Sequence, residues 1–407
     1  MRIAYIAPYQ GPTLLNRRPI NCNLSLGGKA KVELIAELLQ KASHTVEILS
    51  QGEVVVGPLK VYPAFPEEEL FNSSIPIFYS SAFPVRFLNG FFSSLSTLRL
   101  FKARHRIAPY DLVIIYNLKP AQVTSANYAL RHLKLPVILE YEDDAFLEIF
   151  KPNGTQFTSR LRLLTVKRLL AAVSGCLAGS PFLLSQVPDN VPKLLLPGVV
   201  AAVTSMTAWR TTIQRDNWVV FSGTHSRFQG LEQLIKAWKI GNFQGWQLHI
   251  AGQGEITGVL HNLAQDDPSI VFHGILSREE NAELLSHGKI TVVAYDVSKT
   301  RGFSFKTLEC LGAGMHVITT RLSALEGLEP ELMSGLTYLD DNEPETIVAC
   351  LKKVIAERIY ERTAQQATLE RYGPSAISRL LEAFLNQVVE STSSLKTHDD
   401  KLKAAAF

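Results

Sequence analysis

A strand–helix–strand pattern near the start of the chain limits its fold more than any other feature. An apolar strand is expected at 3–7. A helical stretch follows, with apolar residues recurring every three or four positions from 32 to 39, and a second strand is expected at 44–49. Two strands joined through a helix form a βαβ unit with parallel strands and a right-handed crossover. The first half should therefore contain a parallel sheet that binds ligands at the carboxyl ends of its strands.

The same pattern starts again in the second half of the chain. A strand at 218–222, a helix at 231–238 and a strand at 246–251 repeat the opening of the first half. The chain has 407 residues, of which 46% are hydrophobic, and this is enough for two cores. We therefore predict an α/β protein with two Rossmann-like domains, whose parallel sheets face each other across a cleft.

The domain limits follow from composition. A short apolar strand ends at Pro197-Gly198, and the polar stretch after it lacks clear periodicity. We predict an N-terminal domain at 1–200 and a C-terminal domain at 217–375. A helix with one apolar face is expected at 376–389, and the Ser-, Lys- and Asp-rich segment 390–407 is expected to be disordered.

Charge and cysteine content exclude several classes of protein. The formal net charge of +3 and the pI near 8.5 are too weak a bias for a nucleic-acid partner. The four cysteines lie far apart, with no CxxC pair, so a zinc site is not expected and the thiols are interpreted as buried in a reducing compartment. With no signal peptide and no apolar run long enough to span a bilayer, a cytoplasmic protein is expected.

The stretch 301–318 is the most informative about function. Ser304 is a good N-cap, a helical run follows it, and Gly312 and Gly314 come just before the next strand. A helix that begins at the crevice of an α/β sheet directs free amides at the ligand, which favours an anion such as a diphosphate. Glu309, one turn further along, is near enough to reach a ribose.

This run resembles the donor-site signature of retaining glycosyltransferases of family 4, which have the GT-B fold. In that signature a Glu, Gly-Phe-Gly, a short helix and a second Glu precede a Gly-Pro-Val-type turn. Glu309 matches the second Glu, which in the family binds the ribose hydroxyls. Arg301 stands where the first Glu normally touches the transferred sugar, and His316 stands where Pro is usual. A subgroup with a Ser-x-Lys-x-x-Glu pattern is more similar, since Ser304, Lys306 and Glu309 fit it.

Further segments of the second half extend the resemblance. The loop 222–230 resembles the first loop of the donor domain, but Thr224 and Gln229 occupy the places of the Arg and Lys that clamp the diphosphate. Charge compensation is then expected from Arg227, Lys306 and Arg301, although Arg227 alone is equally well explained as a solvated surface residue. The Gly252-x-Gly254 turn and the strand end at Ile275 also match, and in relatives the backbone at the latter position contacts the base.

The first half offers two candidate contacts. Gly27-Gly28 resembles the glycine pair that faces the diphosphate, although a loop needing positive φ before a helix would explain the pair nearly as well. A buried strand at 137–140 ends in a carboxylate cluster, of which Glu142 and Asp143 are expected to face the crevice and orient sugar hydroxyls or an acceptor. The competing interpretation is an acidic helix cap.

A basic stretch at 83–106 alternates aromatic residues with Arg and Lys. Such a segment can lie on anionic lipid or bind a lipid-linked acceptor. More often it is a core helix with a charged outer face. Contact with the inner face of a membrane is therefore one of two readings of this segment.

The resemblance implies transfer of a hexosyl group from a nucleotide diphosphate sugar to a glycan or lipid-linked glycan, with retention of configuration. No metal, other cofactor or protein nucleophile is required. Lys306, Arg301 and Glu142 are the candidate catalytic residues. The donor contacts that it implies are Glu309, Gly302, Phe303, Ser304, Gly28, Gly223, Thr224, Arg227, Gly252 and Ile275. Two alternatives remain: a catalytically silent GT-B subunit or glycan-binding module, and a sugar-nucleotide hydrolase or epimerase.

Overall fold

The computed structural model describes residues 1–19, 26–54, 57–68, 74–85, 88–146, 156–201, 204, 215–297, 305–322 and 330–405. The chain divides into two compact units. Unit 1 comprises Met1–Cys22, Lys29–Leu196 and Ser378–Phe407, and unit 2 comprises Asn23–Gly28 and Pro197–Ile377. Each unit has its own sheet and its own hydrophobic core.

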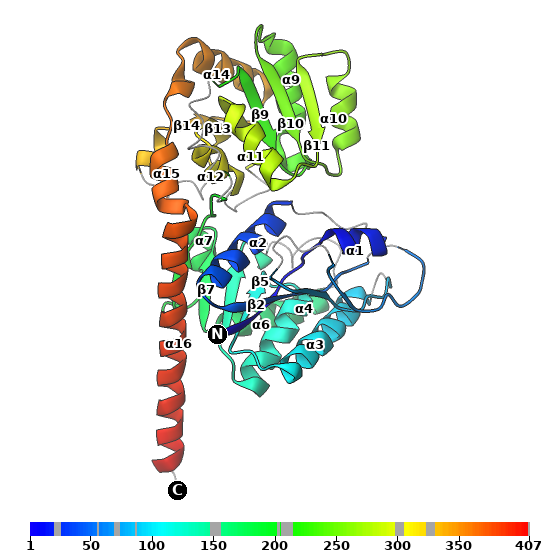
Figure 1. Ribbon diagram of the computed structural model, residues 1–407, viewed down its shortest axis with the longest axis vertical. Helices are drawn as coiled ribbons and strands as arrows, with labels where there is room; N and C mark the ends of the chain where they lie inside the picture. Colours follow the sequence, from blue (N-terminus) through cyan, green and yellow to red (C-terminus); the bar gives the residue numbers. More distant parts are fainter. Residues whose placement is uncertain are drawn as a thin grey trace. The chain divides into compact units, whose positions relative to one another are not determined.

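Unit 1 is built on an eight-stranded sheet with the order β3-β4-β2-β1-β5-β6-β7-β8 (Figure 1). All neighbouring strands are parallel except β3 and β4. The strands are β1 (Arg2–Ile6), β2 (Thr45–Ser50), β3 (Phe65–Pro66), β4 (Ile77–Tyr79), β5 (Leu112–Tyr116), β6 (Val137–Tyr141), β7 (Gly175–Ala178) and β8 (Lys193–Leu195). The helices are α1 (Pro12–Arg17), α2 (Leu26–Lys41), α3 (Asn89–Ile107), α4 (Pro120–Tyr128) continued by the π-helix η1 (Ala129–Leu133), α6 (Gln156–Leu170), α7 (Pro181–Leu184) and α16 (Pro374–Ala405).

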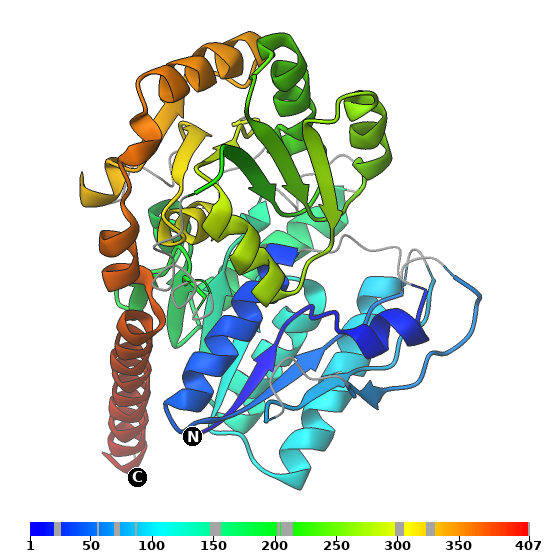
Figure 2. The ribbon, with the colours of Figure 1, turned by 45° about the horizontal axis from the view of Figure 1, so that its top comes forward.

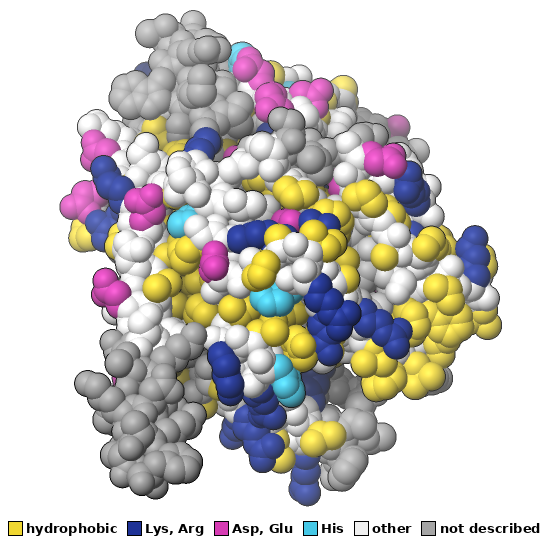
Figure 3. Space-filling model, turned by 60° about the horizontal axis from the view of Figure 1, so that its bottom comes forward, with side chains coloured by type: hydrophobic (Ala, Val, Ile, Leu, Met, Phe, Trp, Pro, Cys, Tyr) yellow, Lys and Arg dark blue, Asp and Glu magenta, His cyan; other side chains and the backbone are white. Residues whose placement is uncertain are grey.

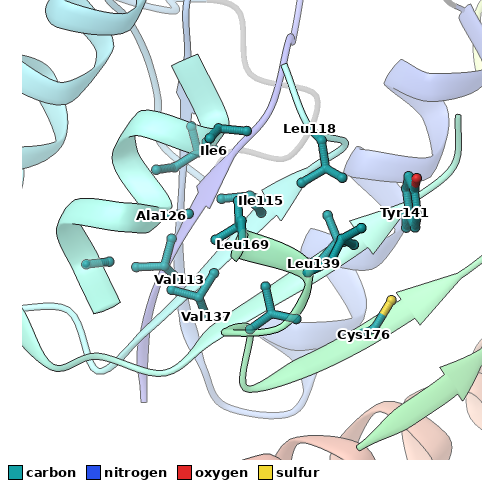
Figure 4. Packing of buried hydrophobic residues seen from close by; sticks show 14 of the residues in the cluster. Ile6, Val113, Ile115, Leu118, Ala126, Val137, Leu139, Tyr141, Leu169 and Cys176 are labelled. Atoms are coloured by element: carbon teal, nitrogen blue, oxygen red, sulfur yellow. The ribbon is translucent and has the colours of Figure 1, made fainter. Parts of the chain in front are cut away.

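Alternate residues of the central strands of unit 1 face different helices, as the period of two in a β-strand requires. One set packs with α3, α4 and α6 in a single buried cluster (Figure 4); from the strands it includes Val113, Ile115, Val137, Leu139 and Cys176. The other set surrounds a small, mostly apolar cavity together with α2 and α16; it consists of Ile114, Ile138, Glu140 and Leu177. The sheet is therefore covered on both faces.

Unit 2 has a six-stranded parallel sheet with the order β11-β10-β9-β12-β13-β14 (Figure 2). The strands are β9 (Trp218–Ser222), β10 (Gln247–Ala251), β11 (Ile270–Gly274), β12 (Ile290–Val293), β13 (His316–Thr320) and β14 (Leu336–Leu339). The helices are η2 (Arg227–Gln229), α9 (Leu231–Gly241), α10 (Thr257–Ala264), α11 (Arg278–His287), α12 (Phe305–Gly312), α13 (Pro330–Met333), α14 (Pro344–Ala356), η4 (Ile359–Glu361) and α15 (Gln365–Tyr372). The strand order reverses between β9 and β12, and a doubly wound sheet of this kind binds ligands at that point.

The βαβ openings predicted for both halves are confirmed, as is the parallel α/β fold class. The local structure differs at Gly28, which lies in the first turn of α2 instead of in a loop, and neither glycine of the pair is among the residues with positive φ. The helix therefore starts before the pair, and positive φ is not the reason for the glycines.

The C-terminal segment also differs from its predicted state. The chain is helical as far as Ala405, whereas 390–407 is predicted to be disordered. The hydroxyls of Ser391, Thr392 and Ser393 donate to the carbonyl oxygens four residues earlier, at 2.8 Å in each case. Such side-chain bonds occur inside helices but slightly weaken them, so they accompany the helical state of this polar segment without explaining it.

The remaining predictions about composition concern thiols, metals and membranes. Cys176 and Cys310 are buried free thiols, and Cys350 is partly buried. In the part of the chain that the structure describes, no group of His, Cys, Asp and Glu side chains is arranged to hold a metal ion. Among those same residues, none of the helices has the length and apolar character needed to cross a membrane.

Candidate functional site

Three glycines line the carboxyl edge of the unit 2 sheet. Gly223 follows β9, Gly252 follows β10 and Gly274 ends β11, with φ values of +152°, +119° and +69°. The Gly223 amide donates to Ala251 O at 3.0 Å, and the Gly252 amide donates to Gly274 O at 2.6 Å. A Cβ added to Gly252 would lie 1.9 Å from Gly223 O, so the two loops touch through their backbones. Only glycine permits this close approach of the two backbones.

Lys306 reaches the point where the strand order of unit 2 reverses. It is the second residue of α12, and its Nζ lies 3.9 Å from the ring centroid of Phe221 in β9. The ring of Tyr295, which follows β12, is 5.8 Å from the same atom. The amine also donates a hydrogen bond to Gln229 Oε1. A Cβ on Gly223 would lie 2.7 Å from Nζ, so the amine sits directly against the first glycine loop.

The environment of the Lys306 amine is unusual for a lysine. Burial lowers its pKa to about 7. Among the residues described, no carboxylate forms an ion pair with it; its partners are an amide oxygen and two ring faces. A cation near the amino end of a helix also opposes the helix dipole. A bound anion would compensate all three of these costs, and the strand ends around the amine are where such a ligand would lie.

Glu309 lies one turn further along α12. Its Oε1 accepts a hydrogen bond from Thr204 Oγ1 at 3.4 Å. Burial raises the pKa of Glu309, while the Thr204 hydroxyl and the Arg278 guanidinium lower it. The Glu309 carboxylate and the Lys306 amine thus lie three residues apart near the start of α12. Residues at this spacing are neighbours on a helix, so the two groups can contact two parts of one ligand.

The other predicted donor contacts of unit 2 differ in exposure. The Arg227 side chain is 71% exposed and lies 3.9 Å from Glu232, while its amide donates to Glu255 Oε1 at 3.3 Å. Thr224 lies in the loop after Gly223, and Ile275 is exposed just beyond β11. The predicted contacts Arg301, Gly302, Phe303 and Ser304 lie outside the described residues.

In unit 1, the predicted carboxylates lie at the carboxyl end of β6. Glu142 Oε1 accepts a hydrogen bond from the buried Lys31 amine, which also donates to Leu196 O at 3.0 Å. Glu140 is fully buried, lies 4.0 Å from Lys31 and accepts a hydrogen bond from Tyr5. Burial raises the pKa of Glu142, and the Lys31 ammonium opposes that rise. The Glu142 side chain remains 15% exposed and the neighbouring Asp143 is exposed, so a ligand can reach both, whereas Glu140 is fully buried.

Asn117 fixes the turn that carries these carboxylates. It follows β5 with a left-handed φ of +60°, and its Oδ1 accepts from the amides of Glu142 at 2.8 Å and Asp143 at 3.0 Å. Its Nδ2 donates to Asp143 Oδ2 at 2.8 Å. Asp144 Oδ1 accepts from the Phe146 amide at 3.0 Å, as expected of a capping residue. The cluster therefore combines a local cap with an oriented pair of carboxylates.

Sequence reasoning did not find four residues that shape these sites. Phe221 and Tyr295 flank the Lys306 amine, but Phe221 lies within the apolar strand β9 and Tyr295 follows β12, and both look like ordinary core residues in sequence. Lys31 lies among the apolar positions of α2 and is buried. A buried lysine usually indicates a carboxylate partner. Asn117 directly after a strand is the kind of residue that tolerates left-handed φ.

The sequence of the second half matches a known family. Residues 216–357 match the model described as glycosyl transferases group 1. No curated protein sequence matches the chain. This match bears out the resemblance found at Glu309 and the glycine loops, for the part of unit 2 that the model covers.

Solved structures similar to the whole chain have the GT-B fold. Sucrose-phosphate synthase from Thermosynechococcus elongatus aligns with a TM-score of 0.68 and 16% identity, over 96% of this chain and 99% of that one. HepE from Anabaena in complex with UDP-glucose aligns with a TM-score of 0.62 and 14% identity, over 97% and 100% of the two chains. The catalytic domain of starch synthase IV from Arabidopsis thaliana, bound to ADP and acarbose, aligns with a TM-score of 0.64 and 9% identity, over 96% and 99%. The fold of this chain is therefore GT-B.

Proposed function

We propose that the protein transfers a hexosyl group from a nucleotide diphosphate sugar to a hydroxyl of a glycan or lipid-linked glycan, with retention of configuration. The observation that carries this proposal is the Lys306 amine, which is partly buried at the switch point of a group 1 glycosyl transferase domain. Its described partners include no carboxylate, and a diphosphate supplies the missing charge.

The donor would lie along the carboxyl edge of the unit 2 sheet. Its diphosphate would contact the Lys306 amine and the amides at the start of α12, and its ribose would contact Glu309. The Gly223 and Gly252 loops would pass close to the phosphates. Negative charge builds on the diphosphate as the glycosidic bond breaks, so an ammonium held there favours the transition state over the bound substrate.

The acceptor would contact the carboxylate cluster of unit 1. Glu142 is partly exposed and is held by Lys31, while Asn117 fixes the turn. We propose that Glu142 and Asp143 accept hydrogen bonds from acceptor hydroxyls, and that the departing diphosphate takes the proton of the attacking hydroxyl. In this mechanism the protein orients the two substrates and stabilises charge, and it forms no covalent intermediate.

The direct test is product analysis with a panel of sugar nucleotides, including UDP-glucose, and candidate glycan acceptors. Among the similar structures, one holds UDP-glucose and another holds ADP, so both nucleotide classes belong in the panel. We expect nucleoside diphosphate release coupled to growth of the acceptor. Release of nucleotide or isomerised sugar without growth would instead identify a hydrolase or epimerase. Absence of nucleotide binding would identify a catalytically silent module.

A further inference from the structure

The outer side of helix α3 carries a single stripe of exposed side chains. The stripe begins just before the helix with Leu88 and continues at helical spacing through Phe91, Leu95, Arg99 and Arg106. Its first half is apolar, with Phe91 68% exposed, and its second half is cationic. Lys102, between the two arginines, is partly exposed and lies 4.1 Å above the ring of Tyr128. Packing of the protein core does not explain why this exposed stripe has aromatic and aliphatic side chains followed by cations.

Helix α6 repeats this composition. Its exposed residues include the aliphatic Leu161 and Leu164 and the cations Arg160, Lys167 and Arg168. Leu161 is 59% exposed. We refer to the exposed residues of α3 and α6 together, with Leu88 and Lys102, as the α3–α6 face.

The two helices lie on the same side of the unit 1 sheet. The crossovers through α3, α4 and α6 all run in one direction along the strand order, so right-handed connections put these helices on one face. Buried residues of all three belong to one core cluster, and α4 packs against both of its neighbours. At the end of α4, η1 and the residue after it add the exposed cations Arg131 and Lys134.

No acidic residue occurs in α3, α4, η1 or α6. Arg104 of α3 is neutralised locally, because its guanidinium pairs with the Glu47 carboxylate at 2.7 Å. Figure 3 shows Lys and Arg side chains gathered next to hydrophobic ones in the lower part of its view, while acidic side chains lie in the upper and left parts. A net charge of only +3 for the whole chain means that this positive charge is concentrated locally rather than spread over the protein.

We propose that the α3–α6 face docks on an anionic phospholipid surface. Cations attract the lipid phosphates, and the exposed apolar side chains enter the boundary between headgroups and acyl chains. A nucleic acid would use the cations alone and would leave Phe91, Leu95, Leu161 and Leu164 in water, so lipid fits the composition better. This inference is independent of the transferase proposal, because it rests on a different surface and is tested without turnover.

The test is co-sedimentation of the full chain with vesicles of phosphatidylcholine alone and of phosphatidylcholine mixed with phosphatidylglycerol. We expect binding to the anionic vesicles, weakened by salt, and little binding to the neutral ones. The double variant Arg99→Gln/Arg106→Gln should lower the partition coefficient roughly 30-fold, since each cation near such a surface contributes a factor of about five. Phe91→Ser should lower it by roughly tenfold through lost apolar contact.

The matched control is Lys352→Gln/Lys353→Gln, which removes two exposed cations from α14 of unit 2. It should bind as the unaltered protein does, and circular dichroism should be unchanged in all variants. Several results would overturn the proposal: no binding to anionic vesicles, equal loss in the control, or binding to RNA through Arg99 and Arg106 without binding to vesicles.

Discussion

At the scale of single residues, Lys306 is the side chain on which the proposed donor site depends most. The family pattern places an Arg and a Lys in the loop after the first strand of the donor domain, and this chain has Thr224 and Gln229 at those positions. The amine of Lys306 comes from a different element and is held against that loop by Gln229 and Phe221. A cation supplied from α12 can therefore take over the charge that the loop lacks, although its neighbourhood makes it easier to deprotonate.

This environment predicts that donor binding depends on pH. The free amine has a pKa of about 7, and a bound diphosphate would raise it, so binding requires proton uptake above pH 7. The dissociation constant of an intact sugar nucleotide should then rise, approaching about tenfold per pH unit above 7. Calorimetric titrations between about pH 6 and 9 measure this slope directly.

Lys306→Arg provides the control for the pH dependence. A guanidinium stays charged throughout this range, so the variant should show a much flatter profile even if its affinity is lower. A flat profile in the unaltered protein would contradict the prediction, and an equally steep one in the arginine variant would assign the titration to another group.

At the scale of elements, α16 completes the core of unit 1. The buried residues of this helix include Leu381, Phe384, Leu385 and Val388. A Cβ atom built on Gly175 of β7 would lie 2.5 Å from the Val388 side chain and 3.0 Å from that of Phe384. The absence of a side chain at Gly175 thus lets the helix approach the sheet. The residues from Ser378 onward belong to unit 1, although α16 itself begins at Pro374.

Phe384→Ala should therefore destabilise unit 1. Phe384 is 5% exposed, and removing a buried phenyl ring costs about 3–5 kcal/mol. Leu380→Ala, one turn away and 45% exposed, is the control and should change stability by less than about 1 kcal/mol. Denaturant midpoints followed by circular dichroism compare the two. Similar midpoints would show that α16 is not part of the cooperative core.

At the scale of the whole molecule, the sequence predicts the two parallel sheets because their signals are local. Apolar runs such as Trp218–Ser222 and helix faces such as that of α9 repeat with the periods of strands and helices. The ends of α2 and α16 are predicted less well. The start of α2 lies before a glycine pair that normally indicates a loop, and the end of α16 is polar, so neither boundary has an apolar pattern to mark it.

The candidate sites likewise combine residues that the sequence predicts with residues that it does not. Glu309, Lys306 and the glycine loops follow from motif spacing along the chain. The partners that determine their chemistry come from distant segments, such as Gln229 and Phe221 for Lys306 and Lys31 for Glu142. Spacing in sequence carries no information about which of these side chains meet. The roles of Arg301 and its three neighbours in the chain stay predictions, as does the placement of the two sheets across a cleft.

The proposed mechanism depends on binding of the sugar-nucleotide diphosphate at the Lys306 amine. The most direct measurement is the dissociation constant of the preferred sugar nucleotide for the unaltered protein, Lys306→Met and Lys289→Met. Lys289 also lies over aromatic rings, 5.8 Å from Trp246 and 5.3 Å from Tyr360, but at the amino end of β12. We predict that affinity falls about 10- to 100-fold in Lys306→Met, the loss expected for a charged hydrogen bond, and stays unchanged in Lys289→Met. Equal affinity of the unaltered protein and Lys306→Met would contradict the account.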